Sequence, residues 1–91
     1  PNYFDGLYSR GVSYYSQAVE IYDEVQTLTD VVLQDEKVKK AEELMNKAMP
    51  VLEKAHGINA EDRNTMTALK QIYGRLGMDD KWLEMKKKLQ G

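Results

Sequence analysis

The chain of 91 residues contains no cysteine, one histidine and two prolines, and it has no apolar run long enough to cross a membrane. Without cysteine there is no disulfide framework, no thiolate metal ligand and no cysteine nucleophile. A net charge of −2 gives no overall basic excess with which to hold nucleic acid or an anionic membrane. A signal-peptide pattern is missing as well, and none of these absences indicates a cellular compartment.

The residues that are present suit one small folded domain, with 42% apolar and 31% charged residues. Charge is unevenly distributed along the chain. Residues 1–35 hold six acidic residues and one basic residue, whereas residues 36–91 hold nine acidic and twelve basic residues. This asymmetry would make the two parts attract each other or orient a charged partner, unless it only reflects the solvated faces of different helices.

Residues 3–29 show a heptad-like pattern that predicts a long helix with an unusually broad apolar face. Because three adjacent rows are apolar or aromatic, we expect this helix to pack on two sides. Gly11 and Ala18 are small and would let a neighbouring backbone approach closely. The rows are Phe4, Gly11, Ala18 and Val25; Leu7, Tyr14, Ile21 and Leu28; and Tyr8, Tyr15 and Tyr22.

Residues 36–56 return to a helical period, and the segment before them is ambiguous. Residues 29–35 are predicted to form a turn capped by Asp30 or Asp35, although Val31 to Leu33 could instead plug the open end of the helix pair or continue either helix. Pro50 predicts a kink in the second helix, and Gly57 predicts its left-handed end. The predicted buried row of this helix is Val38, Ala41, Met45, Ala48, Leu52 and Ala55.

Two shorter helices are predicted in the remainder of the chain. Asn59 to Asp62 resembles an N-terminal cap, Gly77 ends the third helix, and Asp79 or Asp80 opens the fourth. No strand-like alternation occurs, so the sequence predicts an all-α protein. The apolar positions of these helices are Met66, Leu69, Ile72, Tyr73 and Leu76, and then Met78, Trp82, Met85 and Leu89.

The spacing of Ala48, Leu52 and Ala55, followed by Leu69, Tyr73 and Gly77, resembles that of the tetratricopeptide repeat (TPR) family, whose period is 34 residues. Gly11 and Tyr14 resemble the first-helix signature of the earlier repeat. The resemblance implies about four helices in antiparallel hairpins, stacked as a right-handed superhelix. The chain departs from the family pattern at Ala60, Lys70 and Trp82. Tyr14 and Tyr73 are 59 positions apart, which implies elongated helices in the first repeat.

The expected organisation is a single domain over residues 1–91, with an elongated first repeat at 3–56 and a second repeat with C-terminal cap at 59–91. Trp82 and Lys86 would make the last helix an end cap. Two repeats are fewer than such stacks normally need. We therefore expect either a homodimer through residues 3–29 or a longer parent protein with further repeats upstream.

The resemblance implies a non-enzymatic module that binds a peptide or protein segment in a concave groove lined by the first helix of each repeat. The lysine–asparagine clamp that some members use for a C-terminal carboxylate is not reproduced. The tyrosines would suit an apolar or proline-containing segment, or would lie buried in a helix or dimer contact. The alternative function is therefore structural homo-oligomerisation through the first helix. The expected groove residues are Asp5, Tyr8, Val12, Tyr15 and Ser16 from the first repeat and Asn64, Thr67, Gln71 and Arg75 from the second.

Enzymatic and metal sites are poorly supported by the sequence. Glu53-x-x-His56 has the spacing of a di-iron ligand pair, but His56 is the only histidine and lies at a helix end. The serines lack the strand–turn context of a nucleophile, and no glycine loop could cradle a phosphate. The cluster Lys86 to Lys88 could touch nucleic acid but also complements a helix dipole. We expect no enzyme activity, no cofactor, no metal and no nucleic-acid partner.

Overall fold

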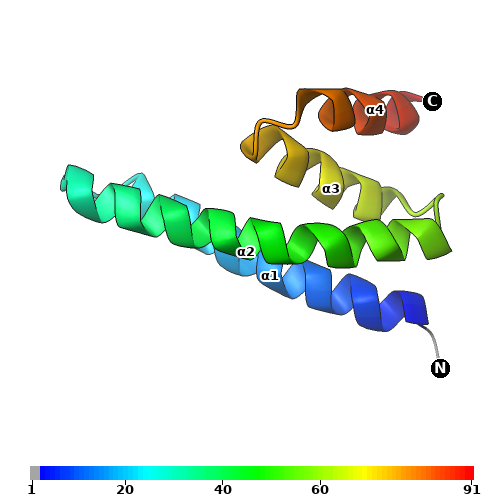
Figure 1. Ribbon diagram of the computed structural model, residues 1–91, viewed down its shortest axis with the longest axis horizontal. Helices are drawn as coiled ribbons and strands as arrows, with labels where there is room; N and C mark the ends of the chain where they lie inside the picture. Colours follow the sequence, from blue (N-terminus) through cyan, green and yellow to red (C-terminus); the bar gives the residue numbers. More distant parts are fainter. Residues whose placement is uncertain (1–2) are drawn as a thin grey trace.

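The computed structural model describes residues 3–91, and within that range the protein is all-α, as the sequence predicts. Its four helices form two antiparallel hairpins, and the second packs over one end of the first (Figure 1). The right-handed superhelix stays a prediction. The helices are α1 (Tyr3–Val25), α2 (Val31–Ile58), α3 (Arg63–Arg75) and α4 (Asp79–Gln90).

Small residues bring the two long helices together. Gly11 and Ala18 are the buried residues of α1. A methyl group placed on Gly11 would lie 2.5 Å from the Leu52 side chain of α2, so α2 packs directly onto the α1 backbone at this point. On α2, the predicted row from Ala41 to Ala55 is buried as expected, while Val38 is half-buried.

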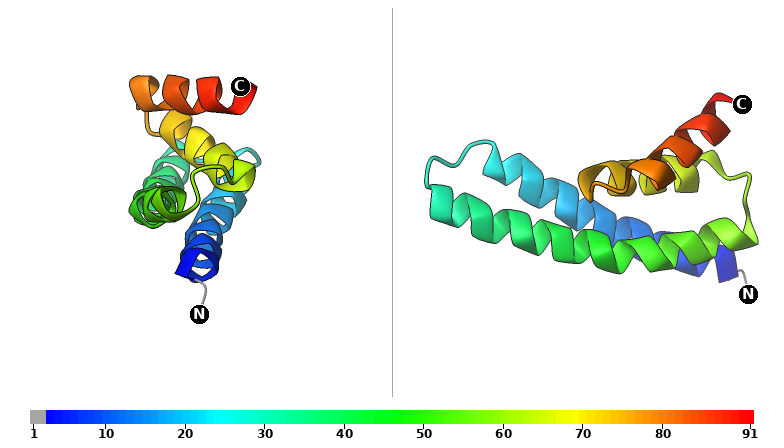
Figure 2. Two further views of the ribbon diagram at one scale, coloured as in Figure 1. Left: turned by 90° about the vertical axis from the view of Figure 1, so that its right-hand side faces the viewer. Right: turned by 45° about the horizontal axis from the view of Figure 1, so that its top comes forward.

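The second hairpin completes the core through α3. Leu69, Ile72 and Tyr73 are buried among residues of the first hairpin, and the fully buried Thr65 donates its hydroxyl to Asp62 at 2.7 Å. The α4 backbone packs only against that of α3 in the described residues, so α4 reaches α2 through side chains alone. The molecule is long and thin, with extents of 43 × 30 × 16 Å (Figure 2). None of the described helices combines the length and apolarity of a membrane span.

The start of α2 differs from the expected turn over residues 29–35. Asp30 is the N-cap, and its carboxylate accepts from the backbone N–H groups of Val32 and Leu33 at 2.9 and 3.2 Å. The helix therefore begins at Val31, five residues earlier than predicted. Val31 to Leu33 form its exposed first turn, so the idea that they plug the helix pair is wrong.

The prediction for the end of α2 at Gly57 is wrong, and the prediction that α3 ends at Gly77 is confirmed. Gly57 lies inside α2, which continues through Pro50 and ends at Ile58; Asn59 is the C-cap, its N–H donating to the Ala55 carbonyl. Gly77 follows the end of α3 as predicted, and it has φ 72°. The N–H groups of Gly77 and Met78 donate to the carbonyls of Gly74 and Tyr73, which is the Schellman arrangement.

Candidate functional site

The tyrosine row of α1 lies beside the core without being buried in it. Tyr8, Tyr15 and Tyr22 are each half-buried and pack at the edge of the core. This follows from the seam with α2: the small residues Gly11 and Ala18 occupy the contact line, and the large side chains of the neighbouring rows spread to either side of it. One flank of α1 is therefore amphipathic and aromatic.

Arg75 connects this flank to α3. Its guanidinium carbon lies 4.4 Å from the centroid of the Tyr22 ring, within the range of a cation–π contact. Burial raises the pKa of Tyr15, and the nearby Arg75 charge partly offsets that rise. The structure thus places Arg75, an expected groove residue of α3, against the tyrosine row of α1 through its contact with Tyr22.

The other expected groove residues are half-buried or exposed. Asp5 is exposed in the first turn of α1, and Tyr8 stacks on Phe4 with ring centroids 5.7 Å apart. Val12 is half-buried. The residues of α3 (Asn64, Thr67 and Gln71) are exposed, as is Ser16 on α1. We call the surface made by the expected residues of α1 and α3 the α1–α3 face; its binding role stays a prediction.

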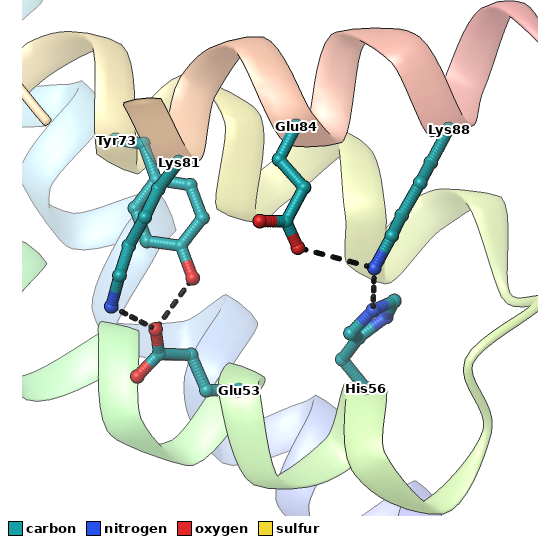
Figure 3. A network of polar contacts seen from close by, with 6 residues as sticks. All are labelled: Glu53, His56, Tyr73, Lys81, Glu84 and Lys88. Atoms are coloured by element: carbon teal, nitrogen blue, oxygen red, sulfur yellow. Dashed lines mark hydrogen bonds and ion pairs between the residues drawn. The ribbon is translucent and has the colours of Figure 1, made fainter. Parts of the chain in front are cut away.

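A second cluster, which the sequence did not predict, surrounds a cavity of about 250 Å³ between α2, α3 and α4. The cavity exists because α4 packs on α3 and leaves a gap to α2, which polar side chains span (Figure 3). Leu69 and Met85 supply its apolar surface. The remaining lining residues are Glu53, His56, Tyr73, Lys81 and Glu84.

Glu53 is the centre of the first half of this network. It accepts a hydrogen bond from the Tyr73 hydroxyl at 2.5 Å and pairs with Lys81 at 3.3 Å. Burial, followed by the hydrogen bond to Glu53, raises the pKa of Tyr73 far above its usual value, so the phenol stays protonated and acts as a donor. Lys81 also lies 5.6 Å from the centroid of the Tyr73 ring.

His56 and Lys88 form the second half. Lys88 Nζ lies 3.4 Å from His56 Nε2 and 3.4 Å from Glu84, so Lys88 bridges the end of α2 and the side of α4. His56 Nδ1 is buried and has no hydrogen-bond partner within the described part of the chain. Desolvation and the Lys88 charge lower the pKa of His56, with Glu84 acting in the opposite direction.

These contacts bear on the Glu53-x-x-His56 pair noted in the sequence. The Glu53 carboxylate is already engaged by Tyr73 and Lys81, and within residues 3–91 no three His, Cys, Asp or Glu side chains are grouped to hold a metal ion. The network instead connects α4 to α2 through the contacts of Lys81 and Lys88. Its one signal in the sequence is the spacing of Lys81, Glu84 and Lys88, which places them on one side of α4.

Trp82 packs within the second hairpin. Its ring lies against Gly74 of α3, where a methyl group would come within 3.1 Å of it. Lys70 and Lys86 lie 5.6 and 5.2 Å from the ring centroid. The indole therefore has one lysine contact from α3 and one from α4. The expected end-cap role of α4 stays a prediction.

Comparison of the chain with known protein families, with curated proteins and with solved structures finds no match in any of the three. The functional assignment therefore depends on the residues and geometry described above.

Proposed function

We propose that the protein is a non-enzymatic, TPR-like interaction module that binds a peptide or protein segment on the α1–α3 face. The observation that carries the proposal is the burial pattern of α1. In a helix of 23 residues, Gly11 and Ala18 are buried, and every aromatic or branched aliphatic side chain is left half-buried or exposed. Such an apolar flank beside a row of polar side chains is typical of a surface that another chain covers.

The chemistry of this face suits an extended or helical segment with apolar anchors. Tyr8 and Tyr15 offer rigid rings with a polar tip, a combination enriched where proteins bind one another. Thr67 and Gln71 are exposed on the α3 side and offer hydrogen-bond donors and acceptors for a backbone lying between the helices. Arg75, held over Tyr22, closes one end with a positive charge.

The experiment is a selection of ligands from a phage-displayed library of random peptides, followed by affinity measurements on the purified protein. Tyr15→Ala should weaken the selected peptides by about 10-fold or more, and Thr67→Ala combined with Gln71→Ala by about 3-fold or more. Glu43→Ala combined with Lys47→Ala, on the exposed side of α2, is the matched control and should leave affinity unchanged.

Circular dichroism and thermal unfolding establish that each variant keeps its helices. Because Thr67 and Gln71 are exposed, their double substitution tests the face even where Tyr15→Ala affects stability. Failure to enrich any peptide would count against the proposal. So would enriched peptides whose affinity is insensitive to all three substitutions on the face.

The same observation supports a second function, homo-oligomerisation through residues 3–29. The opposite flank of α1 is also incompletely covered, since Leu7, Tyr14 and Ile21 are half-buried and Tyr3 is exposed. Sedimentation analysis separates the two functions. A dimer that dissociates when Tyr14→Ser or Ile21→Ser is introduced would favour the structural role, and a monomer at all concentrations would exclude it.

A further inference from the structure

The first hairpin ends in a projecting turn that presents three consecutive exposed apolar side chains. We call residues 23–37 the hairpin apex; they comprise the end of α1, the connecting turn and the start of α2. Val31, Val32 and Leu33 are 66%, 68% and 37% exposed. The apex extends beyond the second hairpin, so α3 and α4 do not cover it (Figure 1). A run of this kind on a surface is unfavourable unless something binds it.

The apex is also held in place by its own contacts. Asp30 caps α2, the Gln34 side-chain amide donates to the Leu28 carbonyl across the turn, and Lys37 pairs with Glu24 of α1 at 2.8 Å. A surface fixed before binding loses little conformational entropy when a partner arrives. The apolar patch therefore has its conformation before any partner binds.

The charged residues of the apex favour one kind of partner. Residues 23–37 contain five acidic residues and one basic residue, Lys37, which pairs with Glu24. Lys39 and Lys40 follow on the next turn of α2, so residues 23–40 together keep a net charge of −2. The acidic residues are all exposed: Asp23, Glu24, Asp30, Asp35 and Glu36. Exposed acidic residues before and after an apolar run are complementary to a basic segment with apolar side chains.

The same charge argues against two other occupants. In a symmetric dimer, two apices would place like charges opposite each other, and three side chains are far fewer than the roughly 20–30 residues a side of a stable interface. An anionic membrane would repel the exposed acidic residues of the apex. We infer that the hairpin apex is a docking surface for a basic, apolar-anchored peptide segment of another protein, separate from the α1–α3 face.

The test uses two synthetic helical peptides with identical leucine positions, one carrying lysine and the other glutamate at every polar position. The ¹⁵N-labelled protein is titrated with each peptide and followed by NMR. We expect the lysine peptide to shift the amide signals of residues 30–36, and the glutamate peptide to leave them unmoved. Val31→Ser combined with Val32→Ser should weaken the lysine peptide about 10-fold or more.

Two variants separate the apolar and the charged contributions. Asp35→Asn combined with Glu36→Gln should weaken binding several-fold at low salt and reduce its salt dependence. Ile58→Ser combined with Leu83→Ser removes exposed apolar side chains elsewhere and should leave affinity unchanged. Serine is well tolerated in the first turn of a helix, so the Val31/Val32 variant should fold.

Several results would overturn the inference. One is lysine-peptide binding that maps away from the apex or persists in the Val31/Val32 variant, and another is equal binding of the glutamate peptide. Self-association that this variant abolishes would assign the apex to a second copy, and binding to phosphatidylcholine vesicles without peptide binding would assign it to a lipid surface. None of these results alters the expectation for Tyr15→Ala on the α1–α3 face.

Discussion

Gly11 and Leu52 determine how closely α1 and α2 approach each other. A Cβ atom on Gly11 would lie 2.5 Å from Leu52 Cγ and Cδ2, and Leu52 is fully buried, so it has little room to move. A Cβ atom on Gly6, which lies earlier on the same helix, would have nothing within 4 Å. The two glycines therefore differ in packing while sharing the same helical conformation.

Gly11→Ala should lower the free energy of unfolding by about 1–2 kcal/mol, since overpacking outweighs the roughly 1 kcal/mol gained in helix propensity. Gly6→Ala should raise it by up to about 1 kcal/mol, because the propensity gain acts alone. Urea denaturation of both variants measures the difference. A Gly11→Ala protein as stable as the wild type would show that the α1–α2 seam is looser than described.

His56 should make the free energy of unfolding of the protein depend on pH. Its pKa in the folded protein is lowered by desolvation and by Lys88, so below pH 6.5 the unfolded chain takes up a proton that the folded chain resists. The free energy of unfolding should therefore decrease as the pH falls below 6.5, and this loss should stop once the folded-state pKa is passed. His56→Gln should remove this part of the pH dependence.

Denaturation of the wild type and the variant on both sides of pH 6.5 checks this expectation. The difference between the two pH profiles reports the contribution of His56. Identical pH profiles would mean that His56 has the same proton affinity in the folded and unfolded chains.

At the scale of the helices, α2 and α3 each have a glycine near the C-terminal end, and the two glycines differ in backbone conformation. Gly57 is helical inside α2, whereas Gly77 has φ 72° and completes the Schellman arrangement after α3. The sequence alone predicts a helix end at both glycines, with a left-handed conformation at Gly57. The difference arises because Asn59 adopts the C-cap geometry of α2 with a hydrogen bond to Ala55, which leaves Gly57 free to stay in the helix.

Gly77→Ala should lower the free energy of unfolding by about 1–2 kcal/mol, because alanine in the left-handed region is strained. Gly57→Ala should be neutral or raise it by up to about 1 kcal/mol. The two variants are each other's control in thermal or urea unfolding. A loss of similar size in both would indicate that α2 ends at Gly57 after all.

Helical periodicity was sufficient to predict the four helices and most of the core, since Ala41, Leu52 and Leu69 are buried where the pattern places them. The beginning of α2 was not predictable in the same way, because Asp30 and Asp35 are equally good caps as residue types and tertiary context selects one. The Glu53–Tyr73–Lys81 contacts depend on how the second hairpin packs over the first. Spacing within one helix carries no information about that packing.

The whole molecule exposes more surface than its mass requires. Its accessible surface is 5968 Å², compared with about 5400 Å² expected for a monomeric protein of 10.5 kDa. The first hairpin is elongated, since its helices of 23 and 28 residues extend past α3 and α4, which have 13 and 12 residues (Figure 2). An extended shape of this kind leaves both the α1–α3 face and the hairpin apex open to partners.

The most direct test of the α1–α3 face is an NMR map of the ¹⁵N-labelled protein with a peptide obtained by display selection. We predict that the largest amide shifts fall on residues 8–15 of α1 and 67–75 of α3, with the free protein sedimenting as a monomer. Shifts confined to the cavity between α2 and α4, or an α1 surface already closed in a dimer before peptide is added, would contradict the proposed binding function.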